Sequence, residues 1–165
     1  MNRPVLISLG SNLGDRFQFL QQAQTRLSRL LGKPFAVSTI RETAAFGVEN
    51  HPPYLNQVLG FETTLPARQI FEHCVMVEDQ LGRDGKGQLL PRTIDIDLLA
   101  CGDEIFRHPD LQIPHPSMHL RKFVLEPLEE IMPGWEHPLL GLNAHYLLHK
   151  LSSGSDSTDM QSLIE

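Results

Sequence analysis

The chain has 165 residues, which suits one folded domain with its own hydrophobic core and is short for two. Apolar residues make up 41% of the chain and charged residues 21%, as in ordinary globular proteins. The formal net charge is −6 without a run of basic residues, which disfavours a nucleic-acid partner but is compatible with a small phosphorylated ligand bound by a few arginines. No stretch suits a signal peptide or a membrane span, so we expect a cytoplasmic protein without a membrane partner.

The first half of the chain alternates strand-like and helix-like patterns. A compact apolar run predicts a buried strand at 4–10, and the helical spacing that follows predicts a helix capped by Asp15 and closed by Gly32. Further strands are predicted at 35–46 and 55–65, separated by a loop rich in turn formers.

The second half begins with a helix predicted over 66–82, which opens at a proline and ends at a glycine. After it we expect a mobile loop at 83–91, and then a strand, a Gly-Asp turn and a short return strand over 93–106. An extended segment at 108–118 follows, and then helices at 122–133 and 142–151. The order βαββαβ predicts a ferredoxin-like α+β fold, an antiparallel sheet flanked by helices. We expect a single domain over 1–151 and a polar, disordered tail over 152–165.

Two cysteines, Cys74 and Cys101, lie within apolar segments and form no C-x-x-C pair. We interpret both as packed free thiols rather than as a disulfide.

Two carboxylates stand out in the apolar run "TIDIDLL". Because side chains alternate along a strand, Asp95 and Asp97 share one face, and Ile94, Ile96 and Leu98 share the other. Two like charges on one face suit a Mg²⁺ ion, which takes one or two protein carboxylates together with phosphate oxygens and water. Two ordinary aspartates on a solvent-facing strand are the alternative at this point.

Charged neighbours strengthen the metal interpretation. Glu78 ends the preceding helix, Arg83 and Arg92 flank the loop before the strand, and Arg121 follows the segment "PHPSMHL". Arginine binds phosphate oxygens bidentately, so the combination predicts a triphosphate site, although each arginine alone is as well explained by a surface ion pair.

Two other motifs are weaker. His108, His115 and His119 invite a zinc interpretation, but their spacing matches no common ligand pattern; His115 is better placed to donate a hydrogen bond to a phosphate. The turn "GSNLGD" at 10–15 follows the first strand but lacks the Lys-Ser/Thr ending of a Walker A motif, so it is not a P-loop.

Four stretches together carry a resemblance: "GSNLGD", "YLNQV", "PRTIDIDLL" and "IPHPSMHLRKFVLEPLEEI". In order and spacing they resemble the 6-hydroxymethyl-7,8-dihydropterin pyrophosphokinase family of folate biosynthesis, over roughly residues 4 to 135. The resemblance implies transfer of the ATP β,γ-diphosphate to the hydroxymethyl oxygen of the pterin, with release of AMP. It also implies two Mg²⁺ ions and a monomer whose partners are its two small-molecule substrates.

By the same resemblance, site residues are carried over position by position. The catalytic set is Arg83, Arg92, Asp95 and Asp97, of which Asp95 and Asp97 are the metal ligands. The ATP contacts are Glu78, Arg83, Arg92, Leu98, Ile113, His115 and Arg121. The pterin contacts are Thr43, Ala44, Phe46, Tyr54, Asn56 and Phe123, with Asn12 supporting the pterin loops. The chemistry agrees, because aromatic faces suit a flat heterocycle and an amide offers both a donor and an acceptor.

Three departures from the family pattern concern the loops. The loop at 84–90 lacks the second arginine and the tryptophan that family members often carry, "TAA" at 43–45 replaces a common Thr-Pro-Pro, and Ser117 stands where arginine is frequent. Two alternatives therefore stay open: a diverged paralogue that binds ATP or pterin with little turnover, and a metal-dependent phosphohydrolase that uses the same D-x-D. An RRM-like RNA-binding module is excluded, because the strand offers acids where it would need exposed aromatics on a basic face.

Overall fold

The computed structural model describes residues 1–43, 52–82 and 93–153. Its strands are β1 (Arg3–Ser11), β2 (Ala36–Val37), β3 (Arg41–Thr43), β4 (Tyr54–Thr63), β5 (Asp95–Cys101), β6 (Phe106–His108) and β7 (Leu111–Ile113). Its helices are α1 (Arg16–Leu31), α2 (Ala67–Gln80), α3 (Lys122–Ile131) and α4 (Ala144–Ser152), with a 3₁₀ helix η1 (Met118–Leu120). The predicted loop at 83–91 and all but the first two residues of the predicted tail lie outside the described residues.

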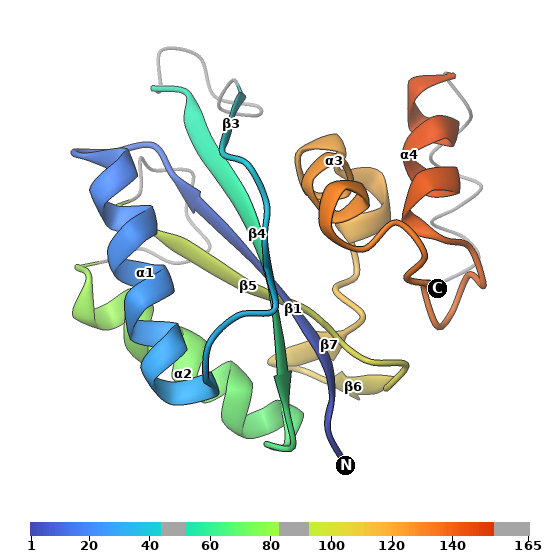
Figure 1. Cartoon of the computed structure of the whole chain (residues 1–165), viewed down its shortest axis with the longest axis horizontal. Helices are drawn as coiled ribbons and strands as arrows, with labels where there is room; N and C mark the ends of the chain where they lie inside the picture. The colour runs from blue at the N-terminus through green and yellow to red at the C-terminus, as the bar shows by residue number, and fades with distance from the viewer. Residues whose placement is uncertain (44–51, 83–92, 154–165) are drawn as a thin grey trace.

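The large sheet has the strand order β2-β4-β1-β5, with β3 also beside β4, and every pairing is antiparallel. Helix α1 connects β1 to β2, and α2 connects β4 to β5, each across a strand that lies between the two (Figure 1). This is the predicted βαββαβ order, and the ferredoxin-like α+β fold is confirmed.

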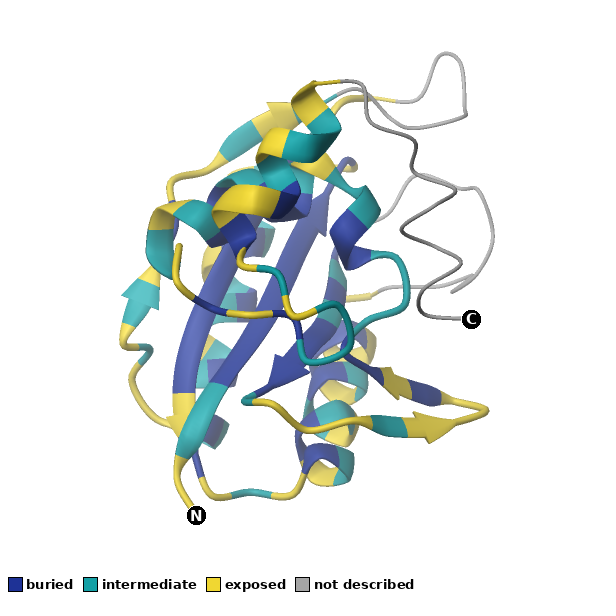
Figure 2. Ribbon diagram, turned by 90° about the vertical axis from the view of Figure 1, so that its right-hand side faces the viewer, coloured by how far each residue is buried: buried dark blue, intermediate teal, exposed yellow. Residues whose placement is uncertain are grey.

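Helices cover both faces of the sheet: α1 and α2 one face, α3 and α4 the other (Figure 1). The alternation of side chains along β1 divides the core in two, because Val5, Ile7 and Leu9 pack with α1 and α2 while Leu6 packs with α3 and α4. Figure 2 shows that the central strands are buried over nearly their whole length.

The first helix has the predicted ends. The Asp15 carboxylate accepts a hydrogen bond from the backbone N–H of Gln18 at 3.1 Å, and Gly32 has a φ of 93°, which glycine adopts without strain. Helix α2 begins at Ala67, directly after Pro66, and ends at Gln80, slightly shorter than predicted.

The strand predicted over 35–46 is two short strands, β2 and β3, and residues 44–46 lie outside the described part. The break falls at 38–40 for a physical reason. The Ser38 side chain accepts from the backbone N–H of Val58 at 2.9 Å, and Thr39 turns to α3, where its N–H and hydroxyl both donate to the Glu130 carboxylate. The polar side chains at these positions thus replace the regular ladder.

The predicted return strand forms as β6, but it pairs with β7 rather than with β5. The outer edge of β5 is already satisfied: the Glu78 carboxylate accepts from the N–H of Ile96, and the N–H of His115 donates to the carbonyl of Leu99 at 2.8 Å. The segment predicted to be wholly extended over 108–118 likewise contains β7 and the start of η1.

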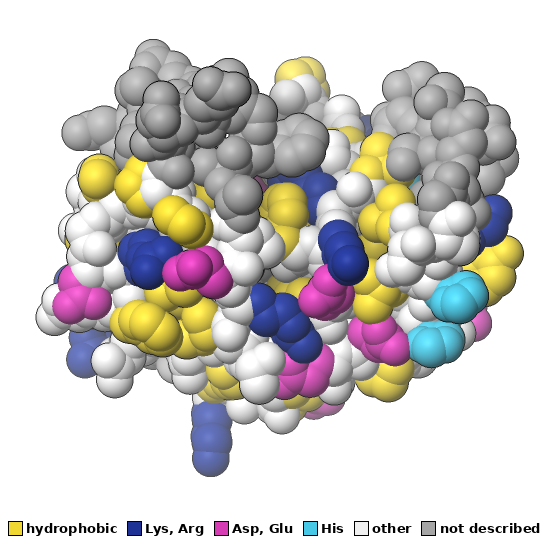
Figure 3. Space-filling model, turned by 90° about the horizontal axis from the view of Figure 1, so that it is seen from above, with side chains coloured by type: hydrophobic (Ala, Val, Ile, Leu, Met, Phe, Trp, Pro, Cys, Tyr) yellow, Lys and Arg dark blue, Asp and Glu magenta, His cyan; other side chains and the backbone are white. Residues whose placement is uncertain are grey.

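Both cysteines are buried thiols outside any disulfide, as predicted, and burial raises the pKa of the Cys101 thiol to about 12. Within the described residues no helix combines the length and apolar character needed to cross a bilayer. On the face seen in Figure 3, basic and acidic side chains are interspersed and neither sign forms a continuous patch.

Candidate active site

Polar residues from four strands form one row near the end of the sheet where β1 ends and β4 and β5 begin. Gly10 of β1 lies opposite Asn56 of β4 on one side and Asp95 of β5 on the other, and Asn56 in turn lies opposite Arg41 of β3. Paired residues point to the same face, and adjacent strands are about 5 Å apart, so Asn56 and Asp95 face the same side about 10 Å apart across Gly10.

The two aspartates of β5 lie as the alternation predicts. Asp95 and Asp97 are half-buried, whereas Ile96 and Leu98 between and after them are buried in the core under α1 and α2. Leu99, on the same face as the aspartates, packs in the second core under α3 and α4. The carboxylates therefore lie at the boundary between the part of this face that packs against α3 and α4 and its polar end.

Glu78 has a different position from the two aspartates. It is 1% exposed on α2, and its Oε2 accepts a hydrogen bond from the backbone N–H of Ile96 at 2.8 Å. Because β5 is an edge strand, this carboxylate satisfies a donor that no neighbouring strand takes, at the residue between Asp95 and Asp97. Glu78 thus holds the strand that carries the carboxylates, and its predicted contact with ATP stays a prediction.

The predicted pterin residues on β3 and β4 meet over Gly10. The Asn56 side chain is 4% exposed, and its Nδ2 donates to the hydroxyl of Thr43 at 2.6 Å. A Cβ at Gly10 would lie 3.4 Å from Cδ1 of Tyr54 and 3.6 Å from Oδ1 of Asn56. Gly10 therefore lies within contact distance of both the ring of Tyr54 and the amide of Asn56, a role the sequence did not single out.

His115 and Arg121 flank η1, on the segment that leads into α3. The ring Nδ1 of His115 accepts from the backbone N–H of Ser117 at 3.2 Å, so the proton of the neutral ring is on Nε2, which is then the atom able to donate to an anion. The guanidinium of Arg121 lies 5.7 Å from the centroid of the Phe123 ring, a cation–π distance that links a predicted phosphate contact to a predicted pterin contact.

Helix α3 is fastened to β3 by charged side chains. Arg41 of β3 lies 3.0 Å from the Glu130 carboxylate and 3.6 Å from that of Glu126. These contacts fix the helix that begins beside Phe123 against the strand that ends at Thr43, so two predicted pterin residues from distant parts of the sequence are held in one region.

The remaining predicted residues fall into two groups. Leu98 and Ile113 are 4% and 1% exposed and pack in the core with α1 and α2, so their side chains serve the fold, and any contact with a nucleotide would fall to their backbone. The others lie outside the described residues: Ala44, Phe46, Arg83 and Arg92.

Within residues 1–43, 52–82 and 93–153, no group of three or more His, Cys, Asp or Glu side chains is arranged to hold a metal ion. A pair of carboxylates without a third protein ligand suits Mg²⁺, which completes its octahedron with substrate phosphate oxygens and water. The donor set of Asp95 and Asp97 therefore fits Mg²⁺ and not a closed structural zinc site.

His119 of η1 is fully buried, and its ring contacts that of His137, which in turn contacts that of Trp135. The ring centroids of His119 and His137 are 5.6 Å apart, and those of Trp135 and His137 are 5.9 Å apart. Burial lowers the pKa of His119, and burial together with the neighbouring His119 lowers the pKa of His137 to about 4. Both rings are neutral at physiological pH and belong to the core between η1 and α4.

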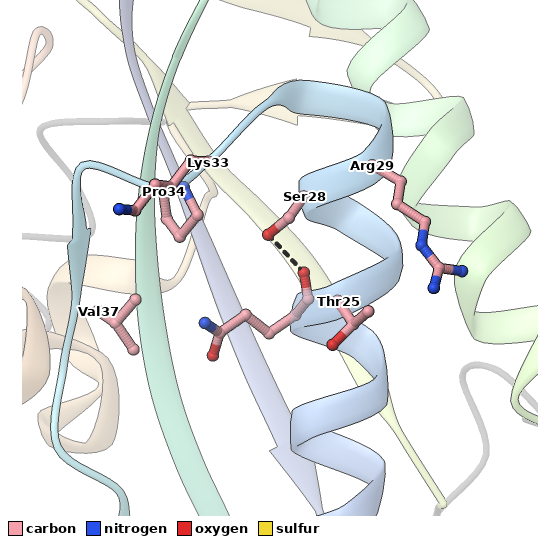
Figure 4. A pocket seen from close by; sticks show the side chains of 7 residues that line it. Thr25, Ser28, Arg29, Lys33, Pro34 and Val37 are labelled. Carbon is pink, nitrogen blue, oxygen red and sulfur yellow. Dashed lines mark hydrogen bonds between the residues drawn. The ribbon is translucent and has the colours of Figure 1, made fainter.

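A shallow hollow of about 550 Å³ lies elsewhere, between α1 and β2 (Figure 4). Its lining includes Arg29, Lys33 and Val37, together with Ser28, whose hydroxyl donates to the carbonyl of Gln24 at 2.7 Å. None of the predicted site residues lines this hollow, and it contains no carboxylate, so it is not the active site.

Comparison with solved structures assigns the fold. The chain superposes on Plasmodium falciparum wild-type HPPK-DHPS with a TM-score of 0.73 and 14% identity, covering 93% of this chain and 45% of that one. A second HPPK-DHPS structure, in complex with substrates, gives a TM-score of 0.73 at 13% identity and 44% coverage of that chain. The present chain thus has the fold found in these proteins and spans less than half their length.

Sequence comparison is more specific. The family model described as 7,8-dihydro-6-hydroxymethylpterin-pyrophosphokinase (HPPK) matches residues 6–133. The 2-amino-4-hydroxy-6-hydroxymethyldihydropteridine pyrophosphokinase of Aquifex aeolicus is 38% identical over 135 residues, covering 82% of this chain and 84% of that protein. The Bacillus subtilis protein of the same name is 38% identical over 132 residues, covering 79% of each. The folic acid synthesis protein fol1 of Pneumocystis carinii is 34% identical over 150 residues, which are 91% of this chain and 20% of that protein.

The sequence relatives therefore define the class as an α+β enzyme that transfers phosphate groups. Within this class, the chain belongs to the 7,8-dihydro-6-hydroxymethylpterin-pyrophosphokinase family. The family consists of enzymes of folate biosynthesis that transfer pyrophosphate from ATP to the hydroxymethyl-dihydropterin and use ATP and Mg²⁺. The predicted family, enzyme class and function are confirmed.

Proposed function

We propose that this chain performs the transfer at the polar end of the sheet, with the pterin between Tyr54 and Phe123 and the ATP phosphates beside Asp95 and Asp97. The observation that carries the proposal is the row in which Asn56 and Asp95 flank Gly10 on one face of the sheet. The amide and the carboxylate are about two strand spacings apart on one face, a separation that suits a heterocycle and a phosphate chain lying end to end.

In this site Asp95 and Asp97 hold two Mg²⁺ ions, which supply neutralisation of the triphosphate charge when bound. Asn56 donates to and accepts from the edge of the pterin, and its hydrogen bond to Thr43 fixes the orientation of the amide. Nε2–H of His115 and the guanidinium of Arg121 hold phosphate oxygens, as do Arg83 and Arg92.

The reaction needs no protein nucleophile. The hydroxymethyl oxygen of the pterin forms a bond to the β-phosphorus of ATP while the bond from that phosphorus to the α,β-bridging oxygen breaks, so AMP leaves and the hydroxyl proton is released. The residues act by holding the two substrates in line and by excluding water between them. Asp95 shares a row with Asn56 across Gly10, so of the two aspartates it is the one nearer to the proposed pterin position and the one that receives the proton.

We further propose that the catalytic unit is a cytoplasmic monomer formed by residues 1–151, with the polar tail from 152 onward outside it. Gel filtration of the full chain alongside a chain ending at residue 153 tests this: both should elute as monomers and turn over equally. A dimer, or loss of activity on truncation, would contradict it.

Nucleotide product analysis tests the function itself. The chain is incubated with ATP and MgCl₂, with and without 6-hydroxymethyl-7,8-dihydropterin, and the nucleotides are resolved. We expect AMP in one-to-one ratio with a pterin diphosphate, and only when the pterin is present. ADP with phosphate would instead identify a phosphohydrolase, and tight binding of both substrates without AMP would identify a diverged binding protein.

A further inference from the structure

Arg16, the first residue of α1, contacts two segments that are distant from it in sequence. One terminal nitrogen of its guanidinium, Nη1, donates to the Glu42 carboxylate of β3 at 3.0 Å and to the backbone carbonyl of Pro53 at 2.9 Å. Glu42 directly precedes Thr43, and Pro53 directly precedes Tyr54. A single side chain thus joins the residues adjacent to two of the proposed pterin contacts.

The two prolines that precede β4, Pro52 and Pro53, are held in place by hydrogen bonds from side chains. Pro52 and Pro53 have no backbone N–H, so only their carbonyls can be held by hydrogen bonds. The Pro52 carbonyl accepts from Nδ2 of the fully buried Asn12 at 3.2 Å, and the Pro53 carbonyl accepts from Arg16. The turn after β1 and the first residue of α1 therefore fix the two residues that lead into Tyr54.

Helix stability does not account for an arginine at this position. The first turn of α1 is the positive end of the helix dipole, where a cation is unfavourable. The capping carboxylate of Asp15 accepts from the N–H of Gln18, whereas the contacts of Arg16 are to Glu42 and Pro53. The ion pair with Glu42 is solvent-exposed on the Glu42 side and contributes little to folding. The contacts of Arg16 are instead tertiary, and both reach the same side of the pterin region.

We propose that Arg16 is a positioning residue of the pterin site: by binding Glu42 and the Pro53 carbonyl together, it steadies the end of the β3–β4 ladder at which Thr43 pairs with Tyr54. The inference rests on the proposed function, since it gives these two residues their role in pterin binding. A ring and a hydroxyl that contact a flat ligand must be held within fractions of an ångström, so loosening the join weakens pterin binding without removing any contacting group.

Loss of Arg16 should therefore weaken the binding of the pterin and not that of ATP. In Arg16→Ala we expect the KM for the pterin to rise about tenfold, while the KM for ATP and the melting temperature stay close to those of the wild type. Arg16→Lys should recover most of the loss, because an ammonium has donors enough for both acceptors. Glu42→Gln, which keeps the Pro53 contact, should show a smaller increase than Arg16→Ala.

Arg26→Ala is the matched control. Arg26 lies on the same helix, and its Nη1 donates to the Gln80 side chain of α2 at 2.9 Å, a contact to neither β3 nor the residues before β4. Both KM values should be unchanged in this variant.

The inference is overturned if Arg16→Ala leaves the pterin KM unchanged, or if it raises both KM values and lowers the melting temperature together, as a general loss of structure would. Wild-type turnover separates this failure from failure of the proposed function. If the wild type releases AMP with the pterin and Arg16→Ala behaves identically, only the positioning role is wrong. If the wild type releases no AMP, the proposed function is wrong, and direct pterin binding to the two proteins, measured by calorimetry, still decides the role of Arg16.

Discussion

The two faces of the central sheet carry different kinds of side chain. The face under α1 and α2 is mainly apolar, with Val5, Ile7 and Leu9 on β1 and Ile96 and Leu98 on β5 all buried. The opposite face is divided, because one part packs against α3 and α4, and the end where β1 finishes carries the buried Asn56 and the half-buried Asp95 and Asp97. One face thus serves stability alone, and the other combines a core with a reactive surface.

The division explains how an acidic pair is tolerated in a buried strand. Alternation puts both carboxylates on the divided face, where the residues opposite them on β1 are Gly10 and Ser8, neither of which carries a large apolar side chain. The hydrogen bond from Ile96 to Glu78 holds the strand from its outer edge. Changes to the aspartates should therefore affect turnover, and changes to the opposite face should affect stability.

The largest expected effect is on the aspartates. Asp95→Asn and Asp97→Asn remove charge but little volume, and each should lower kcat at least 1,000-fold, equivalent to about 4 kcal/mol of transition-state stabilisation. The melting temperature should not fall. Asp103→Asn, an exposed aspartate beyond the end of β5, is the control. Near-normal turnover in either site variant would show that the carboxylates are ordinary surface residues.

Truncating one buried leucine on each side of the sheet should show that the two faces have different roles. Leu27→Ala on α1 should lower the free energy of unfolding by about 3 kcal/mol, because it leaves a cavity in a fully buried position, without changing either KM. Leu125→Ala on α3 should destabilise similarly but also raise KM, since α3 begins at the segment carrying Arg121 and Phe123. Denaturant unfolding and steady-state kinetics measure both. Equal kinetic effects from the two variants would erase the distinction between the faces.

The buried histidine in the loop after α3 should make stability depend on pH. Nδ1 of His137 accepts from the backbone N–H groups of Leu139 and Leu140, and burial holds its pKa at about 4, against about 6.5 in the unfolded chain. The unfolded state therefore binds more protons between these values. Stability from this group is complete above pH 6.5 and is lost as the pH falls to 4, by about 3 kcal/mol at most.

His137→Asn tests that dependence, because an amide oxygen can accept the same backbone hydrogen bonds without titrating. Its stability should fall less than that of the wild type between pH 6.5 and 4, whereas His149→Asn, on an exposed residue of α4, should follow the wild type. Parallel curves for His137→Asn and the wild type would contradict the assignment.

The smallest effect concerns Glu78. Glu78→Ala leaves the N–H of Ile96 without its acceptor in a buried place and should cost about 2 kcal/mol of stability, whereas Glu78→Gln keeps an acceptor and should cost less than half as much. Thermal unfolding of the two variants measures the difference. Equal losses would mean that the charge of Glu78, and not its hydrogen bond, matters.

Local patterns predicted much of this arrangement. The cap at Asp15 and the alternation around Asp97 follow from neighbouring residues alone, and the structure confirms both. The pairing of β6 with β7 could not be predicted, because it depends on Glu78 and His115 occupying the outer edge of β5. The hydrogen-bonding groups at the edge of this strand are satisfied by residues distant in sequence, which local patterns do not predict.

In the site, too, local sequence patterns do not predict the tertiary contacts. The resemblance to the family supplied Asn56 and Asp95, but not the register that puts Gly10 between them, since register depends on strand pairing over more than 40 residues. The bridge from Arg16 to Glu42 and Pro53 is likewise tertiary. Sequence pattern identified the residue types of the site, and the fold determined which of them meet.

Metal binding at the two aspartates tests the central claim most directly. Mn²⁺ is titrated by electron paramagnetic resonance in the presence of an ATP analogue with a methylene bridge between the α- and β-phosphorus, which cannot react. We predict two ions bound per wild-type chain, and loss of at least one in Asp95→Asn and in Asp97→Asn, with Asp79→Asn on the exposed side of α2 unchanged. Identical Mn²⁺ binding by the wild type and both site variants would contradict the assignment of the divided face as the metal and phosphate site.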